Sequence, residues 1–368
     1  MAKIVTITNP LTGQPAQVDQ LDHTAQQIDD GLNIARGVSN PNLLDNWHFG
    51  NPVDQRQGRI VKPNTTYYSD NTLATAAGTT SAYVTAYRYA TGTVNGVNYA
   101  SFKLTNSDLA PTYYAAPENV VRGYTGTGYG IDRWRQLYDS TYCLIQDSYV
   151  SFYGTDFGQM IETKRIPLNT PLTYSVLTAE GILGSITFQF DGTQNQTVAL
   201  LIGETKFRAN FIYNWGGTYT PFFLQTEGNV INVVAMKLEL GSQQTLAHQD
   251  ENGVWQLNEI PDYGEQLRRC QRYFRRFSAR YALGGFQNET NAVFRYPCNP
   301  PMRTAPVLKL ERESDLTNAL DDGSSSVTPS RVVLNWTTST DTVGFYFSGA
   351  TANTCCVCNR YVDASADL

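Results

Sequence analysis

In residues 186–192, Ile-Thr-Phe-Gln-Phe-Asp-Gly, apolar side chains alternate with polar ones, and an Asp-Gly pair follows. A period of two places one set of side chains on one face of a β-strand, and Asp-Gly marks a turn. Further strand-like runs lie at residues 83–89, 151–155, 230–234, 292–296, 307–310, 332–336 and 343–347. With no helix long enough for a βαβ unit, these runs predict an all-β protein built around a β-sandwich.

The composition agrees with a strand-rich protein and argues against several classes. Charged residues make up only 16% of the 368, and 23 tyrosines stand beside four methionines, which suits pleated, half-buried strands. A net charge of −6 without a dominant basic run argues against a nucleic-acid partner. Met1-Ala2-Lys3 precedes a short mixed segment, and no run approaches the roughly 20 apolar residues of a membrane span. We therefore expect no signal peptide, no membrane insertion and synthesis in a cytoplasm.

An apolar seam marks the first 40 residues as a separate segment. Leu21, Ala25, Ile28 and Leu32 follow one another at steps of four, three and four, which is the heptad period of a short amphipathic helix. Two heptads are too short to be stable alone. The seam therefore packs either in a self-associating bundle, as an N-terminal anchor, or against its own domain, and the pattern leaves both open.

A second helical pattern covers Pro261 to Phe274, where Leu267, Cys270 and either Tyr273 or Phe274 share one face. Because strand patterns lie on both sides of it, we predict that this helix connects two β-rich regions. The predicted organisation is an anchor over 1–40, a large sandwich over 41–258, a connector over 259–280 and a smaller C-terminal β tip domain over 281–368.

No grouping in the sequence supports catalysis. None of the three histidines, His23, His48 and His248, lies beside a Ser or Cys elbow of the Gly-x-Ser-x-Gly kind. Asp132 and Asp139 flank Trp134 only in sequence, so no carboxylate pair of the glycosidase kind stands out. We predict no enzyme and no catalytic residues.

Metal and cofactor patterns are equally weak. Cys355, Cys356 and Cys358 gather three thiols, but a structural zinc site needs a second ligand couple, and Cys298 is the only candidate nearby in sequence. Six cysteines are too few and too unevenly spaced for a disulfide framework. Residues 123–130 are glycine-rich but are followed by neither the lysine nor the helix of a phosphate loop. We predict no cofactor and no metal, although oxygen ligands such as those of Asp45 and Asp54 leave an ion site open.

A basic stretch begins inside the connector. Its members are Arg268, Arg269, Arg272, Arg275, Arg276 and Arg280, with aromatic residues between them. The arginines either contact an anionic glycan or phosphate, or form a solvated helix face whose stems cover apolar surface. In a trimer they could also pair with carboxylates of a neighbouring chain.

Five segments together resemble bacteriophage and prophage tail proteins. They are Asn42–Arg56 (NLLDNWHFGNPVDQR), Gly128–Trp134 (GYGIDRW), Ala235–Gly241 (AMKLELG), Tyr263–Phe274 (YGEQLRRCQRYF) and Pro300–Pro306 (PPMRTAP). The resemblance implies a jelly-roll sandwich similar to carbohydrate-binding modules, a compact β tip, and a homotrimer in a tail fibre, baseplate or neck appendage. The virion is then the expected location, after synthesis in the cytoplasm of the host bacterium.

The partners that this resemblance implies are other virion proteins at the N-terminus and a host-surface glycan at the C-terminus. Exposed aromatic side chains would stack on sugar faces, and the candidates are Tyr281, Phe286, Tyr296, Trp336 and Tyr346. In the sandwich, Trp47, Phe49, Ile131, Trp134, Leu238 and Leu240 are the predicted core. Two alternatives remain open, namely a passive neck, collar or baseplate decoration that binds only virion proteins, and a polysaccharide depolymerase.

Overall fold

The computed structural model describes most of the chain from residue 40 onward. The described ranges are 40–62, 65–69, 72–75, 84–94, 96–103, 112–138, 141–154, 156–193, 195–277, 283–288, 290–311, 313–321, 326–336, 338–349 and 355–366. The chain divides into two compact units, Met1–Asn40 and Pro41–Leu368. The seam at Leu21, Ala25, Ile28 and Leu32 lies outside the described residues, so both interpretations of it stay predictions.

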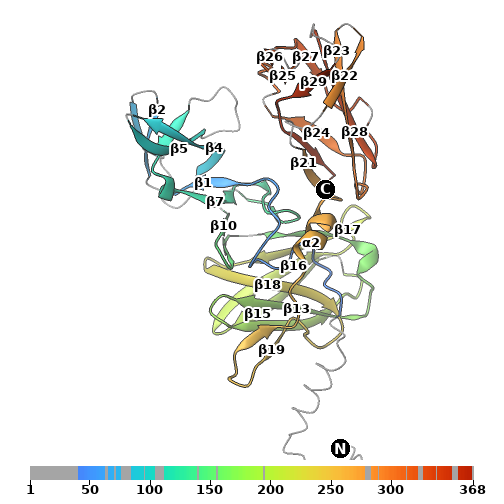
Figure 1. Cartoon of the computed structure of the whole chain (residues 1–368). Coiled ribbons are helices and arrows are strands. Elements are labelled where there is room, and N and C mark those ends of the chain that lie inside the picture. The colour runs from blue at the N-terminus through green and yellow to red at the C-terminus, as the bar shows by residue number, and fades with distance from the viewer. Residues whose placement is uncertain are drawn as a thin grey trace, which may run out of the picture. The chain divides into compact units, whose positions relative to one another are not determined.

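The prediction of a mostly β protein is confirmed (Figure 1). The described residues form antiparallel sheets, one of which curls into half a barrel, and one short helix, α2 (Tyr263–Cys270). Two 3₁₀ turns, η2 (Pro117–Asn119) and η3 (Thr163–Arg165), interrupt the strands. Among the described residues, no helix has the length and apolar character needed to cross a bilayer.

Two large sheets account for the residues before the helix. The twelve-stranded sheet runs in the order β14 (Leu183–Gln189), β13 (Pro171–Thr178), β18 (Val230–Leu240), β11 (Val150–Tyr153), β10 (Tyr142–Ile145), β7 (Val120–Thr125), β1 (Arg59–Val61), β4 (Val84–Val94), β5 (Val97–Lys103), β6 (Tyr113–Ala115), β2 (Thr66–Ser69) and β3 (Thr72–Thr75). The six-stranded sheet runs in the order β15 (Asn195–Ile202), β16 (Thr205–Ile212), β17 (Tyr219–Gln225), β12 (Phe157–Glu162), β9 (Arg135–Gln136) and β8 (Gly128–Tyr129). A small sheet pairs β19 (Ala247–Gln249) with β20 (Trp255–Leu257).

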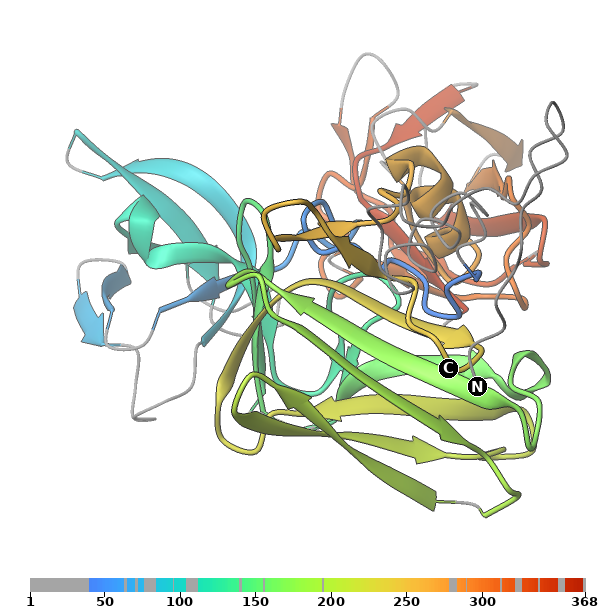
Figure 2. The same ribbon diagram turned by 90° about the horizontal axis from the view of Figure 1, so that it is seen from below.

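The part of the twelve-stranded sheet from β14 to β10 shares one hydrophobic core with the six-stranded sheet, and the two lie in adjacent layers (Figure 2). Strands β1, β5, β6 and β7 contribute to a separate small core, which consists of Val61, Ala100, Phe102, Ala115 and Val120. On β14, Ile186 and Phe188 pack against the core while Thr187 is exposed, as the alternation in the sequence predicts. Tyr174 of β13 meets Phe222 of β17, with ring centroids 4.6 Å apart. Burying one such aromatic side chain contributes roughly 1.5–3 kcal/mol, so these contacts hold the two layers together. Residues 42–257 are called the first module below.

The predicted anchors of this core are confirmed with one exception. Trp47, Phe49, Ile131, Trp134 and Leu238 are all buried. Leu240 is 36% exposed, so its prediction as a core residue is wrong. Leu240 shares a sheet face with Leu238 but is the last residue of β18, where the strand ends and the core no longer covers it.

The C-terminal module, residues 274–366, has a core of its own. Its three-stranded sheet runs β21 (Phe274–Phe277), β30 (Val362–Ser365), β24 (Val307–Leu310). Its seven-stranded sheet runs β26 (Ser326–Val327), β25 (Leu320–Asp321), β29 (Cys355–Cys358), β22 (Leu283–Asn288), β23 (Asn291–Pro297), β28 (Thr342–Ser348), β27 (Arg331–Val333). The predicted connector over 259–280 thus contains the strand β21 as well as the helix.

The seven-stranded sheet must curl, because its two edge strands are close neighbours in sequence. β26 ends at Val327 and β27 begins at Arg331, and four residues span at most about 14 Å. The edges of a flat seven-stranded sheet would lie about 29 Å apart at ordinary strand spacing. The short link therefore draws the two edges toward each other (Figure 1).

A helix within the predicted connector is confirmed, but it is shorter than predicted. Its N-cap Asp262 accepts a hydrogen bond from the backbone N–H of Glu265 at 2.8 Å, a capping arrangement that fixes the start of the helix. The helix ends at Cys270, and Phe274 instead begins β21, where it pairs with Ser365. Cys270 is buried as predicted, but Phe274 reaches the interior from a strand and not from the helix face.

Candidate functional site

The structure separates the aromatic residues predicted to contact a receptor. Tyr281 lies outside the described residues, and Phe286 lies in β22, where its side chain is not described. Tyr296 packs against the C-terminal core, with its ring stacked on Phe277 at 4.7 Å and its hydroxyl buried. Burial also raises the pKa of Tyr296. Tyr296 therefore serves the core, since an outward-facing stacking residue would keep its ring face free.

Trp336 and Tyr346 come together on the outer face of the C-terminal sheet. Their rings meet edge to face, with centroids 5.8 Å apart, and the Arg295 guanidinium lies 5.2 Å from the Trp336 ring centroid. In the strand register Tyr346 lies opposite Val293 of β23 and Val333 of β27. Both side chains are only partly buried. We call Arg295, Trp336 and Tyr346 the aromatic cluster, and the sequence reasoning missed its arginine.

A pocket of about 470 Å³ opens at the curled edge of the same sheet. It is lined by Glu313, Ser314, Asp315, Leu316, Thr317, Thr328, Pro329, Ser330, Arg331 and Val332. We call it the edge pocket. Its volume falls within the range of roughly 300–1,000 Å³ typical of small-molecule sites. Strand β27 (Arg331–Val333) supplies the last two lining residues and pairs with β28, which carries Tyr346, so the pocket and this member of the aromatic cluster lie on neighbouring strands.

Hydrogen bonds hold the loops of the edge pocket in place. The Asp315 carboxylate accepts from the backbone N–H of Thr317 at 3.1 Å, and the Thr328 hydroxyl accepts from the backbone N–H of Asn318 at 3.0 Å. The Ser330 hydroxyl donates to the Ser348 carbonyl at 3.1 Å, which ties the loop to β28. Carboxylates, hydroxyls and one guanidinium in a pre-formed pocket are the groups that hydrogen-bond sugar hydroxyls.

A buried ionic network joins the first module to α2. Asp45 pairs with Arg133 at 3.3 Å and with Arg269 at 3.1 Å. The Arg133 guanidinium lies 3.4 Å from the ring centroid of Tyr273. Arg133 itself has φ of 74°, a left-handed conformation that costs energy in a residue with a Cβ. The ion pair and the stacking compensate for that cost.

Other segments that resemble tail proteins meet around the same network. Asp132 pairs with Arg56 at 3.1 Å, and the backbone N–H of Asn46 donates to the Gln266 side chain at 2.8 Å. The backbone N–H of Arg303 donates to the Arg272 carbonyl at 2.7 Å. Four of the five segments that resemble tail proteins thus meet at this junction, which means that they determine how the helix joins the body.

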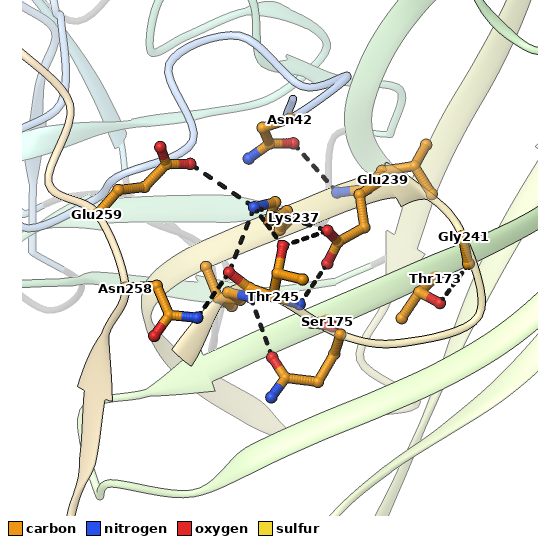
Figure 3. Close-up of polar contacts among 12 residues, drawn as sticks. Asn42, Thr173, Ser175, Lys237, Glu239, Gly241, Thr245, Asn258 and Glu259 are labelled. Atoms are coloured by element: carbon orange, nitrogen blue, oxygen red, sulfur yellow. Dashed lines mark hydrogen bonds and ion pairs between the residues drawn. The ribbon is translucent and has the colours of Figure 1, made fainter. Parts of the chain in front are cut away.

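The fifth segment, in β18, contains a buried ionic cluster that the sequence reasoning missed (Figure 3). Lys237 and Glu239 are fully buried. The Lys237 ammonium lies 2.8 Å from the Thr245 hydroxyl, 3.7 Å from Glu239 and 3.6 Å from Glu259. Glu239 accepts from both the backbone N–H and the hydroxyl of Thr245. Burial raises the pKa of Glu239, which the Thr245 hydrogen bonds and Lys237 oppose. The cluster fixes the segment that leads from β18 toward α2.

Asp54, Cys356 and Cys358, which were weaker candidates for metal ligands, lie in the protein interior. Asp54 accepts from the Tyr124 hydroxyl and pairs with Arg122 at 3.4 Å, so its oxygens serve the fold. Cys356 and Cys358 are buried in β29, and burial raises the pKa of Cys358 to about 12. Among the described residues, no three His, Cys, Asp or Glu side chains are grouped as metal ligands.

The histidine and carboxylate candidates are dispersed. His48 is half-buried beside Trp47, and burial lowers its pKa. His248 lies in strand β19 of the small sheet, and its Nδ1 atom is 2.6 Å from the side-chain oxygen of Asn258. His23 and Asp139 lie outside the described residues.

Comparison of the chain with models of known protein families, with curated proteins and with solved structures found no match.

Proposed function

We propose that this chain is a structural and attachment protein of a bacteriophage tail, a homotrimer whose C-terminal module binds a host-surface glycan. The observation that carries this proposal is an edge pocket and an aromatic cluster on neighbouring strands of one sheet. A sugar ring could stack on the partly exposed Trp336 or Tyr346 while the pocket's hydroxyls and carboxylates bind its hydroxyl groups. The resemblance of five sequence segments to phage tail proteins supports the proposed class of protein.

In this proposal the first module is a jelly-roll spacer. Its two antiparallel sheets over a shared core are compatible with that fold. The segment over 1–40 would dock on another virion protein, and the junction around Asp45 would hold the spacer and the tip in a fixed relation. Such rigidity suits an appendage that transmits a binding event along its length.

Attachment predicts that labelled full-length protein binds cells of a susceptible bacterial strain. We expect Trp336→Ala and Tyr346→Ala each to weaken binding by about tenfold, because each removes one aromatic face of the cluster. The matched controls are Trp215→Ala and Tyr138→Ala, which remove exposed aromatic residues of the first module and should leave binding unchanged. Flow cytometry over a concentration series measures the affinity.

Two outcomes would contradict attachment through this site. If folded protein binds no strain in a panel that includes susceptible hosts, the passive virion decoration replaces the attachment role. If the control variants lose as much affinity as Trp336→Ala, the aromatic cluster is not the contact.

The depolymerase alternative keeps one observation in its favour, because two carboxylates, Glu313 and Asp315, line the edge pocket. Release of reducing ends from host polysaccharide, abolished by Glu313→Gln or Asp315→Asn, would establish that activity. Asp315 already accepts a backbone hydrogen bond within its own turn, so a role in capping that turn accounts for it equally well.

The trimer is a separate prediction that rests on the seam of Leu21, Ile28 and Leu32 and on the resemblance. Sedimentation equilibrium at micromolar concentration is expected to give three times the chain mass of 40.9 kDa. Ile28→Asp should lower that mass, because a carboxylate in the seam would have to be buried. A mass of one chain for the unaltered protein would rule the trimer out.

A further inference from the structure

The structure assigns separate roles to the arginines of the basic stretch. Four of them have partners within the protein: Arg268 pairs with Glu265, Arg269 with Asp45, and Arg276 with Asp363, while Arg275 donates to the Pro300 carbonyl. Arg280 lies outside the described residues. Among the described arginines of this stretch, only Arg272 has a side chain with no ion pair and no hydrogen bond. Internal partners thus account for four of them, but Arg275 and Arg276 lie in β21 and not on the predicted helix face, whereas the side chain of Arg272 is exposed.

Arg272 lines a small pocket at the junction between the first module and α2. The pocket has a volume of about 140 Å³ and is lined by Asp45, Glu162, Arg165, Arg269, Arg272 and Tyr273. We call it the arginine pocket. It is smaller than the roughly 300 Å³ at the lower end of ordinary ligand sites, so it suits a single compact group better than a whole sugar. Arg165 ends the turn η3, and Arg272 lies just after α2.

The charges of the arginine pocket do not cancel. Its two carboxylates are already engaged, because Asp45 pairs with two guanidinium groups and Glu162 pairs with Lys164 at 2.9 Å. The hydrogen bond from Lys164 is the largest of the causes that lower the pKa of Glu162, and the charge of Arg272 contributes. Within the described part of the chain, the side chains of Arg165 and Arg272 have no ion pair and no hydrogen bond. Two positive charges without a close partner thus line one small cavity.

We propose that the arginine pocket binds a compact oxyanion, a phosphate or a carboxylate group, between Arg165 and Arg272. Each guanidinium presents a planar set of N–H donors that matches the oxygens of phosphate or carboxylate. The ligand would bridge the end of β12 and the turn after α2, across the junction. The site lies in a different module from the edge pocket and does not depend on the glycan proposal.

Titration of the full-length protein with inorganic phosphate, and separately with glucuronate, tests this site by calorimetry at constant ionic strength. Saturable binding of either probe is expected, and the better probe identifies the source of the oxyanion. Arg165→Gln and Arg272→Gln should each weaken binding by about tenfold. The affinity of Arg272→Lys should lie between those of the unaltered protein and Arg272→Gln, because lysine keeps the positive charge but lacks the planar guanidinium group. The matched control is Arg268→Gln, which removes one charge from α2, just before Arg272 in the sequence.

The Arg268→Gln control distinguishes binding in the arginine pocket from a general effect of net charge on affinity. If Arg268→Gln weakens binding as much as Arg272→Gln, or if neither probe binds, the proposal is wrong. Arg165 and Arg272 support no internal ion pair, so circular dichroism of their variants should match that of the unaltered protein. Binding to cells is not part of this readout, so a failure here leaves the attachment proposal untouched.

Discussion

Replacing Trp134 by alanine is expected to lower the free energy of unfolding by about 3–5 kcal/mol, the usual cost of truncating a large buried aromatic side chain. Trp134 is fully buried. Its ring stacks on Phe157 at 4.8 Å and contacts Phe49 at 5.0 Å. Its indole N–H donates to the Asn46 carbonyl at 2.9 Å. Alanine would leave a cavity in the core and an unsatisfied carbonyl in the segment that positions Asp45.

Urea denaturation followed by circular dichroism, at one fixed protein concentration, measures this loss. Trp215→Ala is the matched control, because Trp215 is 48% exposed in the turn before β17. Its effect should stay within about 0.5 kcal/mol. Equal losses for the two tryptophans would mean that Trp134 is not the anchor that its burial indicates.

Replacing Lys237 by alanine is expected to cost about 3 kcal/mol, because the change leaves Glu239 as a buried charge without its cation. The estimate is at the lower end of the usual range, since the two Thr245 hydrogen bonds to Glu239 remain. The loss should be largest for the segment over 242–259, which the cluster fastens to β18. Hydrogen exchange of the amides in that segment, together with urea denaturation, provides the measurement.

Two further variants show whether the loss comes from the uncompensated charge. Lys164→Ala breaks a lysine–glutamate pair at the surface, where Lys164 is 80% exposed, and should cost less than about 1 kcal/mol. The double variant Lys237→Met/Glu239→Gln removes both buried charges and should restore part of the stability lost by Lys237→Ala. A double variant as unstable as the single one would contradict this explanation.

The strand pattern of the sequence is a good guide wherever one face of a strand is buried. The alternation at Ile186 and Phe188 predicts both the strand and its inward face, because a one-residue shift would expose both side chains. The same reasoning fails at Leu240, where the periodicity continues but the core does not. The periodicity reflects the local geometry of the strand. Whether a residue at the end of the strand is buried depends on whether other strands cover that position.

The residues of the candidate site were harder to predict from the sequence than the strands. Trp336 and Tyr346 were among the predicted contacts, but so was Tyr296, which turned out to pack against Phe277. The alternation in Ala292–Tyr296 already placed Arg295 on the face opposite Phe294, and this signal could have found the arginine. Nothing local marked Arg165, because its partner across the pocket, Arg272, is more than 100 residues away in sequence.

The β-rich class, the positions of many strands, the helix before the C-terminal module and most of the aromatic anchors of the first core could be predicted from the residues alone. These follow from short-range physics, since side-chain alternation, turn residues and helix caps act over a few residues. Other features follow from tertiary contacts alone: the joint burial of Lys237 and Glu239, the absence of an ion pair or hydrogen bond between the Arg272 side chain and any described residue, and the pocket beside the edge strand β27. These features depend on contacts between distant segments, and the burial and pairing of a charge are properties of the folded chain as a whole.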